Sequence, residues 1–343
     1  MEHLPRDTED GAPPIQPFLE GALIHRGVPA RIASLTRRPS EYRTSCPLEE
    51  VDLRFDTGGQ LSLVFKDLSP HRLTGAARLA KPEFLRDPRR ELDVYTHLLD
   101  RLEVGTATCY GTVADEVAGR FWLFLERVSG VELYQVGAVE VWQDVARWLA
   151  AWHSRFPARV ASAPPVSGLI VYDEAFYRCW SVRALEYLRA HQPPGDEAAL
   201  SAFARVTDRY DRVVEALLSC EATVLHGEFY ASNIMVTAPD RAGRVCPVDW
   251  EMAAIGPGLM DLAALTSGTW SEPNRRAIAT AYRDALPPGP ARPSTPAFFE
   301  MLDVCRLHVA MQWLGWARDW SPPPEHTQNW LGESLRLADR LGL

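Results

Sequence analysis

The sequence predicts an α+β fold of two lobes: a small N-terminal lobe built on an antiparallel sheet and a larger, mostly helical C-terminal lobe. Three observations predict it. Apolar residues alternate with a period of two over much of the first third of the chain. A Gly-containing hairpin signal joins two of these segments. After "VSG" at 128–130 the apolar spacing becomes three and four, which is typical of amphipathic helices.

The N-terminal elements follow in order from these patterns. Strands are expected for "RIASLTRR", "PLEEVDLRF" and "LSLVFKDL", and "DTGG" at 56–59 joins the last two. A helix is expected over 87–102, because its apolar residues are three or four apart and Asp87 before Pro88 is a good N-cap signal. "TCYGTV" and "RFWLFLERV" then predict two more strands.

The remainder is predicted to be mainly helical. "EVWQDVARWLAAWHSRF" has the spacing of a long amphipathic helix. Further helices are expected, between Pro-rich breaks, at 174–191, 197–219, 273–285, 297–320 and 326–341. Two short strands, in "TVLHG" and "RVCPVDW", interrupt them.

Composition excludes several classes of protein. The 343 residues include 46% hydrophobic and 24% charged residues, ordinary values for a globular protein. The net charge of -9 argues against nucleic acid as a partner and for a cationic one, although solubility explains it more simply. Six scattered cysteines give no metal or disulfide spacing, which fits the cytoplasm. The acidic N-terminus is unlike a signal peptide, and no apolar run is long enough to span a membrane.

Polar residues that carry chemistry gather around the two short strands. "HGEFYASNIMV" supplies Glu228 and Asn233, and Asp249 ends the apolar segment "RVCPVDW". A hairpin-like turn between two strands would bring Asn233 and Asp249 together. An amide oxygen beside a carboxylate suits magnesium. Glu228 would face the same space as a base or as an orienting group.

Lys66 lies within an apolar strand, where an unpaired charge is costly. One interpretation is an edge-strand lysine whose ammonium group reaches water. The other is an ion pair with Glu91, one turn into the next helix, as kinases use to hold nucleotide phosphates.

In combination these segments resemble the aminoglycoside phosphotransferase and choline kinase group of kinase-fold enzymes. "HGEFYASN" is similar to that group's HGD-x-x-x-x-N catalytic loop, and "VDWEMAAIGPGLMDLAAL" to its metal-binding segment. "FKDL" and "RRELDVYTHLL" resemble the lysine strand and the glutamate helix. "LFLERVSG" resembles the hinge and "LAAWHSRF" the helix after it. The resemblance spans roughly 60 to 270 in the correct order and implies a two-lobed protein-kinase-like fold.

The resemblance also implies roles for individual residues. It implies an N-terminal tail (1–19), a nucleotide-binding N-lobe (20–127) and a C-lobe (128–343) that carries the catalytic loop and the acceptor site. By this resemblance, Lys66 contacts the nucleotide phosphates, Glu91 orients Lys66, and the backbone of Glu126 to Val128 binds the base. Asn233 and Asp249 bind Mg²⁺. His226 and Asp261 brace the catalytic loop. The implied cofactors are ATP or GTP and Mg²⁺. The partners are then a nucleotide and a small-molecule acceptor, favoured to be cationic. No nucleic acid and no membrane are expected, and a homodimer is left open.

Two features depart from the group's pattern. Glu228 stands where the group has Asp, and the extra methylene moves the carboxylate by on the order of 1 Å, a change that can cost about a hundredfold in rate. The loop "RRPSEYRTSCPL", where a nucleotide-covering turn is expected, has no glycine. Its hydroxyl side chains at Ser40, Thr44 and Ser45, with Arg43, would contact phosphate, or the loop is a simple surface turn.

Several alternatives stay open at this stage. The function implied is Mg²⁺-dependent O-phosphorylation of a small molecule of antibiotic, sugar or amino-alcohol type. The alternatives are a kinase acting on a peptide side chain and a kinase-like pseudoenzyme that binds or scaffolds. Glu251 is a second metal-reaching acid or, as we favour, a solvated one. In 304–320, one face carries Val304, Leu307, Met311 and Leu314 and the other Trp313, Trp316 and Trp320. One face must be core, and the tryptophan face lines a substrate cleft or covers a second buried surface.

Overall fold

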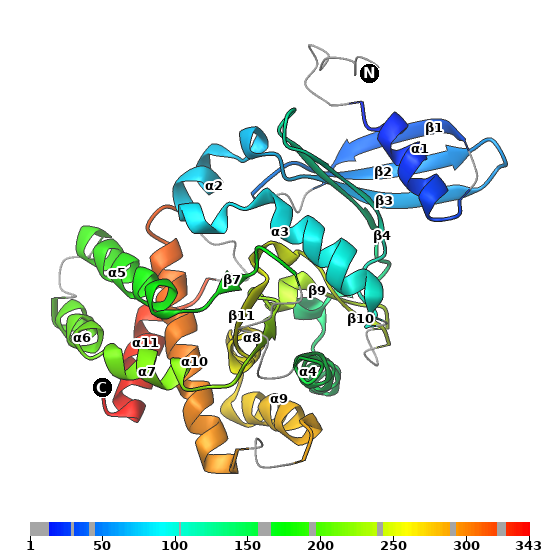
Figure 1. The fold of residues 1–343 in the computed structure, drawn as a ribbon. Helices are drawn as coiled ribbons and strands as arrows, with labels where there is room; N and C mark the ends of the chain where they lie inside the picture. Colours follow the sequence, from blue (N-terminus) through cyan, green and yellow to red (C-terminus); the bar gives the residue numbers. More distant parts are fainter. Residues whose placement is uncertain are drawn as a thin grey trace.

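The protein forms two lobes (Figure 1). The computed structural model describes residues 14–28, 31–40, 45–102, 104–156, 166–191, 197–238, 243–288, 293–320 and 327–343. We call the described residues up to 127 the N-lobe and those from 128 onward the C-lobe. The sheet of the N-lobe lies at the upper right of Figure 1, and the helices of the C-lobe fill the lower half.

The N-lobe sheet is antiparallel, as predicted, with strand order β1-β2-β3-β5-β4. Its strands are β1 (Ile32–Pro39), β2 (Leu48–Phe55), β3 (Gln60–Asp67), β4 (Cys109–Asp115) and β5 (Arg120–Glu126). The predicted hairpin is confirmed, with Arg54 opposite Gln60 across the turn. Along β5, Trp122 and Phe124 face one hydrophobic cluster, and Leu123 and Leu125 face another, so this strand is buried on both sides.

Helix α1 (Gln16–His25) covers the outer face of this sheet (Figure 1). Its fully buried Leu19 and Leu23 join Trp122 and Phe124 in one cluster. Residues 16–19, expected in a tail, therefore form the first turn of a packed helix. The signal for it was present, since Leu19 and Leu23 are one helical turn apart and follow a proline. Residues 1–13 of the expected tail lie outside the described residues.

Helix α3 (Pro88–Asp93) lies between the sheet and the C-lobe (Figure 1). It begins at the predicted N-cap, where the Asp87 side chain accepts a hydrogen bond from the Arg89 N–H at 2.9 Å. The helix continues as a π-helical turn (Val94–Leu98) and a 3₁₀ turn (Leu99–Arg101). The short helix α2 (Gly75–Ala80) precedes it. These helices and turns belong to the segment that connects β3 to β4.

The C-lobe is built around α10 (Thr295–Trp316), which contacts α5, α7, α8 and α11. The other helices are α4 (Val139–His153), α5 (Glu174–His191), α6 (Glu197–Asp208), α7 (Asp211–Leu218), α8 (Leu259–Leu265), α9 (Glu272–Ala285) and α11 (Trp330–Leu341). The helix expected over 197–219 is two helices, with a turn at 209–210. Every residue of α10 from Leu302 to Trp316 is buried, so both of its faces are core.

Six short strands connect the helices to the site. Strands β6 (Val131–Glu132), β9 (Ile234–Val236) and β10 (Val245–Pro247) form one small sheet. Strands β7 (Ile170–Val171), β8 (Ala222–Leu225) and β11 (Ala254–Pro257) form another. The loop between β8 and β9 contains "HGEFY", and the loop between β10 and β11 contains "DWEM".

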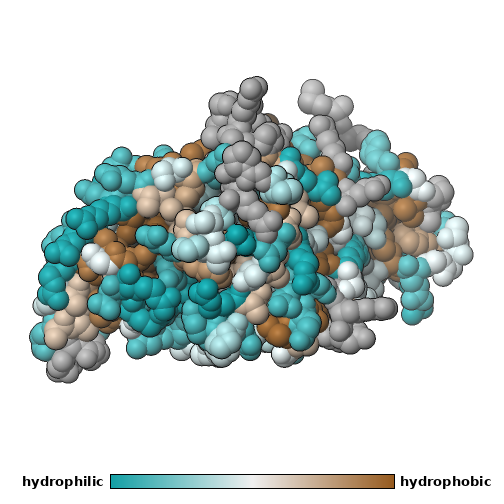
Figure 2. Space-filling view, turned by 90° about the horizontal axis from the view of Figure 1, so that it is seen from below, coloured by the Kyte–Doolittle hydropathy of each residue, from teal (hydrophilic) through white to brown (hydrophobic). Residues whose placement is uncertain are grey.

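The surface seen from below mixes hydrophilic residues with separate hydrophobic patches (Figure 2). None of the described helices combines the length and apolar character that crossing a bilayer requires. All six cysteines are free, as their spacing predicted.

Candidate active site

Lys66 joins the two lobes. Its Nζ lies 2.6 Å from Oε2 of Glu91 in the N-lobe and 2.6 Å from Oδ1 of Asp249 in the C-lobe. The Lys66 side chain is only 9% exposed, so the interpretation of its ammonium group as reaching water is wrong. Although burial alone would lower it, the carboxylates of Asp249 and Glu91 raise the pKa of Lys66 well above its ordinary value. Lys66 is therefore a fixed positive charge between two acids.

Glu91 holds the lysine and the C-lobe at the same time. Its Oε2 accepts from Lys66, and its Oε1 accepts from the backbone N–H of Trp250 at 3.2 Å. Burial raises the pKa of Glu91 to about 7, while the Lys66 charge opposes this rise. The strand lysine and the helix glutamate thus form the pair expected from their spacing.

Asp249 has an unusual backbone. Its φ of 65° is the only positive φ of a non-glycine residue in the part of the chain that the structure describes. Non-glycine residues in this region are strained, and such strain gathers at functional sites. Lys66 lowers the pKa of Asp249 against the effect of burial. Since Oδ1 accepts from Lys66, the second carboxylate oxygen is the one available to a cation.

The loop before Glu228 is held by a buried carboxylate. Asp261, at the start of α8, accepts the backbone N–H groups of His226 at 2.7 Å and Gly227 at 3.0 Å. The His226 ring donates from Nε2 to the carbonyl of Val248 at 2.9 Å. These contacts agree with the bracing roles expected of His226 and Asp261.

Gly227 is required by the shape of this loop. Its φ is +85°, and a Cβ there would lie 2.0 Å from the backbone oxygen of Met252. No side chain fits so close to a backbone atom, so only glycine, which has no Cβ and readily adopts a positive φ, fits at this position. The close approach brings the loop of Glu228 against the loop that follows Asp249.

Glu228 has a fixed backbone and a partly buried side chain. Its carbonyl accepts from the Tyr230 N–H at 2.7 Å and from Nδ2 of Asn233 at 3.0 Å. Burial, and then the negative charges of Glu251 and Asp249, raise the pKa of Glu228 to about 8. Because the backbone is held on both sides, the length of the side chain decides where the carboxylate lies.

Asn233 and Asp249 are brought together by the β9–β10 hairpin. Ile234 pairs with Pro247, and the Val248 N–H donates to the Asn233 carbonyl at 2.9 Å. The expected juxtaposition is therefore present, although the pairing strand is β9 and not β8. Since Nδ2 of Asn233 donates to Glu228, its Oδ1 is the atom left for a cation.

Sequence and structure comparisons agree with this geometry. Residues 52–295, which include all of these side chains, match the phosphotransferase enzyme family, APH. The chain belongs to this family. No curated protein is similar enough in sequence to refine the assignment of this phosphotransferase.

Solved structures agree on the fold of this phosphotransferase. A microcompartment-associated aminopropanol kinase matches with a TM-score of 0.58 and 16% identity over 94% of each chain. A choline kinase from Streptococcus pneumoniae gives a TM-score of 0.55 and 14% identity over 96% of this chain and 97% of that one. The GDP complex of an aminoglycoside 2'-phosphotransferase gives 0.55 and 14% over 95% and 97%. At such identities the likeness shows the fold, and it confirms the two-lobed kinase-like architecture.

The phosphotransferase site fits a divalent cation. Asn233 Oδ1 and the second oxygen of Asp249 are hard oxygen ligands on adjoining strand ends, of the kind Mg²⁺ binds together with phosphates and water. No group of three or more His, Cys, Asp or Glu side chains in the described ranges converges as a metal site, so phosphate and water oxygens would complete the coordination. The neighbouring carboxylates of Glu251 and Asp249 also help to raise the pKa of Glu228, so the site has negative charge that a cation would neutralise.

The loop expected over the nucleotide is described only in part. Ser45 lies at the site, since its hydroxyl is 3.5 Å from Oε1 of Glu251. Ser40 is buried at the end of β1. Arg43 and Thr44 lie outside the described residues.

The hinge follows β5. The backbone N–H of Glu126 already donates to the Thr108 carbonyl at 2.8 Å, so it is not left for a base. The Glu126 side chain holds both Arg244, from 2.6 Å, and Thr108. The Glu126 side chain therefore has a structural role, and base binding by the backbone of Glu126 to Val128 stays a prediction for the groups other than this N–H.

Lys81 and Arg90 complete the site and were missed from the sequence. Lys81, which follows α2, places Nζ 2.5 Å from Oε1 of Glu251. Arg90, beside Glu91, is buried and donates to the Glu251 carbonyl at 2.9 Å. Glu251 is therefore an ion-paired acid, and the expectation of a solvated one is wrong. Neither basic residue belongs to a local motif, although Arg90 directly precedes the predicted glutamate.

The tryptophan face of α10 covers a second buried surface. The Trp313 ring meets the Tyr230 ring edge-on at 5.1 Å, and Tyr230 lies two residues after Glu228. Trp313 also stacks on Trp330 of α11 at 5.3 Å. Through Trp313, the tryptophan face of α10 therefore packs against the loop that contains Glu228 and Tyr230.

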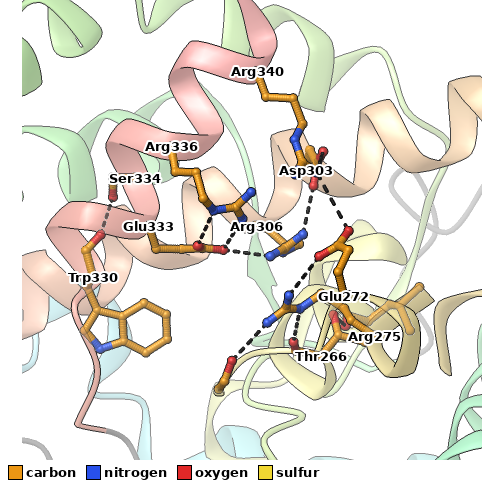
Figure 3. A network of polar contacts seen from close by, with 12 residues as sticks. Thr266, Glu272, Arg275, Asp303, Arg306, Trp330, Glu333, Ser334, Arg336 and Arg340 are labelled. Atoms are coloured by element: carbon orange, nitrogen blue, oxygen red, sulfur yellow. Dashed lines mark hydrogen bonds and ion pairs between the residues drawn. The ribbon is translucent and has the colours of Figure 1, made fainter. Parts of the chain in front are cut away.

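Beyond Trp330, a cavity of about 180 Å³ lies between α8, α10 and α11. Arg275, Arg306 and Arg336 line it with Glu333, in the ion network of Figure 3. Arg306 is buried between Asp303 and Glu333. This network ties α9, α10 and α11 together.

Proposed function

We propose that this phosphotransferase transfers the γ-phosphoryl group of ATP or GTP, with Mg²⁺, to a hydroxyl group of a small molecule. One observation carries the proposal. Lys66, paired with Glu91, meets Asp249 across the lobes, beside Asn233 and Glu228. This is the set of charges that phosphoryl transfer requires, because such transfer depends mostly on positioning and electrostatics.

On the nucleotide side, Lys66 binds the phosphates, and Glu91 keeps it in place. Asn233 and Asp249 hold the metal. When bound, Mg²⁺ neutralises and orients the phosphate oxygens. Ser45 donates to phosphate from above, and the backbone near Val128 binds the base. The similar structure of a GDP complex supports a purine nucleotide as the phosphoryl donor, with ATP and GTP both open.

On the acceptor side, Glu228 orients the hydroxyl and accepts its proton. We infer an acceptor of amino-alcohol, sugar or antibiotic type, since similar structures are kinases of aminopropanol, choline and an aminoglycoside. The net charge of -9 favours a cation, whereas Lys66, Lys81 and Arg90 supply positive charge at the site itself. Anionic and neutral alcohols therefore belong in the same screen. We infer a cytoplasmic location, because nucleoside triphosphates are available there and the six free cysteines suit a reducing compartment.

A pseudoenzyme is the main alternative, and Glu228 in the place of Asp favours it. The complete set of Lys66, Glu91, Asn233 and Asp249 favours turnover, because a protein that only scaffolds has no need of an intact metal and phosphate site. A kinase of peptide side chains would use the same residues on a larger acceptor.

A transfer assay tests the proposal. Purified protein is incubated with γ-labelled ATP or GTP and a panel of alcohols, sugars, aminoglycosides and peptides, with Mg²⁺ or with chelator. We expect Mg²⁺-dependent label in a small molecule, lost in Asp249→Ala, which still folds in a cooperative unfolding transition. Label on peptides only would favour the side-chain kinase. Mg²⁺-dependent nucleotide binding without any labelled product would favour the pseudoenzyme.

A further inference from the structure

Lys81 is a charged residue of the site that the family motifs do not explain. Its side chain is 10% exposed, although it belongs to a short connecting segment. Buried lysines are costly unless paired, and Lys81 is paired with Glu251 of the other lobe. Both residues therefore lie at the meeting point of the lobes, close to the reacting groups.

The backbone on both sides of Lys81 is fixed by arginines. Arg86 donates to the Lys81 carbonyl from Nε at 2.8 Å and from Nη2 at 2.7 Å. Arg183 of α5 donates to the Ala80 carbonyl at 2.9 Å. A side chain that only filled space would not need a backbone held from two directions. Such support is what a preorganised functional group requires.

The partner of Lys81 is fixed as well. The Glu251 carbonyl accepts from Arg90, whose guanidinium also binds the carbonyls of Phe84 and Leu85. The segment after Lys81 is thereby attached to the loop after Asp249. The ammonium group is thus held in place through both its own chain and its carboxylate.

The charge of Lys81 reaches the acids on both sides of the transfer. Although burial opposes it, the carboxylate of Glu251, and then those of Glu228 and Asp249, raise the pKa of Lys81. In the proposed function, Glu228 contacts the acceptor and Asp249 the metal–nucleotide. In that function the phosphoryl group passes between these two acids, and the Lys81 ammonium group is held 2.5 Å from Glu251, two residues after Asp249.

We propose that Lys81 is a catalytic residue: a cation, supplied from the N-lobe and held by Glu251, that contacts the transferring phosphoryl group. This inference rests on the proposed function. A cation placed in cis stabilises the charge spread over the equatorial oxygens in the transition state, as arginine fingers do in other phosphotransferases. Lys66 contacts the phosphates of the bound nucleotide, whereas Lys81 contacts the phosphoryl group as it is transferred.

Binding of a transition-state mimic tests this role without a known acceptor. The probe is Mg·ADP with and without aluminium tetrafluoride, and the measurement is the dissociation constant of Mg·ADP. In the wild type we expect the fluoride complex to tighten binding by about a hundredfold. Lys81→Met should bind Mg·ADP alone within about twofold of the wild type and lose most of the tightening. Lys81→Arg should keep part of it.

Arg26→Met is the matched control, because it removes an ion-paired cation of the N-lobe, the partner of Asp100, and leaves Lys81, its backbone support and Glu251 unchanged. It should tighten like the wild type. If Lys81→Met does not fold, the double variant Lys81→Met, Glu251→Gln is measured in its place, because it does not leave the Glu251 carboxylate without its partner. Undiminished tightening in the lysine variant, or no tightening in the wild type, contradicts the role of Lys81. Failure of the wild type to bind Mg·ADP at all contradicts the proposed function, and this inference with it.

Discussion

Replacing Gly227 by alanine should disturb the site, because the added methyl group has no room in the loop. The Cβ would lie 2.0 Å from the Met252 oxygen and 2.8 Å from its carbonyl carbon, and both are backbone atoms that cannot rotate away. The positive φ of +85° adds about 1–2 kcal/mol of strain. Overpacking against backbone adds about 1–3 kcal/mol. We therefore expect a loss of about 2–5 kcal/mol in the free energy of unfolding.

Gly58→Ala separates the two contributions. Gly58 has nearly the same φ, +87°, but nothing lies within 4 Å of its added Cβ. It should lose only the strain energy, about 1–2 kcal/mol. Urea unfolding at a common m value gives both free energies, and thermal shift with Mg·ADP shows whether the loop still supports the site. Equal losses in the two variants would refute the close contact between the two loops.

Two further predictions concern the lysine pair and the hinge. Lys66→Met should abolish Mg²⁺-nucleotide binding and destabilise the fold by about 3–5 kcal/mol, because buried Glu91 loses its partner. Adding Glu91→Gln should recover stability in urea but not nucleotide binding, and recovery of both would contradict the phosphate role. At the hinge, the pKa of Glu126 is lowered from 4.5 to about 2, mainly by hydrogen bonds from Arg244. A lowered carboxyl pKa stabilises the fold above 4.5, and this stability is lost as the pH falls toward 2. Glu126→Gln should therefore be less stable than the wild type at neutral pH and equal to it near pH 2, and a constant difference across thermal melts at several pH values would refute this.

The residues that gather in the candidate site could be predicted because each lies in a segment with its own local signal. Glu228 and Asn233 follow one apolar strand, Asp249 ends another, and Lys66 interrupts a third. Ordinary pairing of β9 with β10 then brings Asn233 to Asp249. Local pattern and site coincide in these segments, so sequence alone was sufficient.

Lys81 and Glu251 show why the remainder could not be predicted. They are 170 residues apart and meet only when the lobes pack together. Glu251 lies in the segment that resembles the metal-binding motif, but Lys81 stands in no periodic or motif context. For the tryptophans of α10 the sequence left two interpretations open, for a different reason. Periodicity identifies a buried face by its contrast with a polar one, and α10 is enclosed on all sides.

The Glu228 variants test the central claim most directly. The Glu228 backbone is held by Tyr230 and Asn233, so its carboxylate reaches the acceptor only through the full side chain. Turnover is measured for Glu228→Gln and Glu228→Asp with the acceptor identified in the transfer assay, alongside Mg·ADP affinity. Our account predicts that Glu228→Gln loses about ten- to a hundredfold in rate with unchanged nucleotide affinity. It also predicts that Glu228→Asp is slower than the wild type, because the shorter side chain falls short. A Glu228→Asp variant faster than the wild type, with Glu228→Gln unchanged, would contradict it and establish a phosphotransferase fold that has lost its catalytic acid.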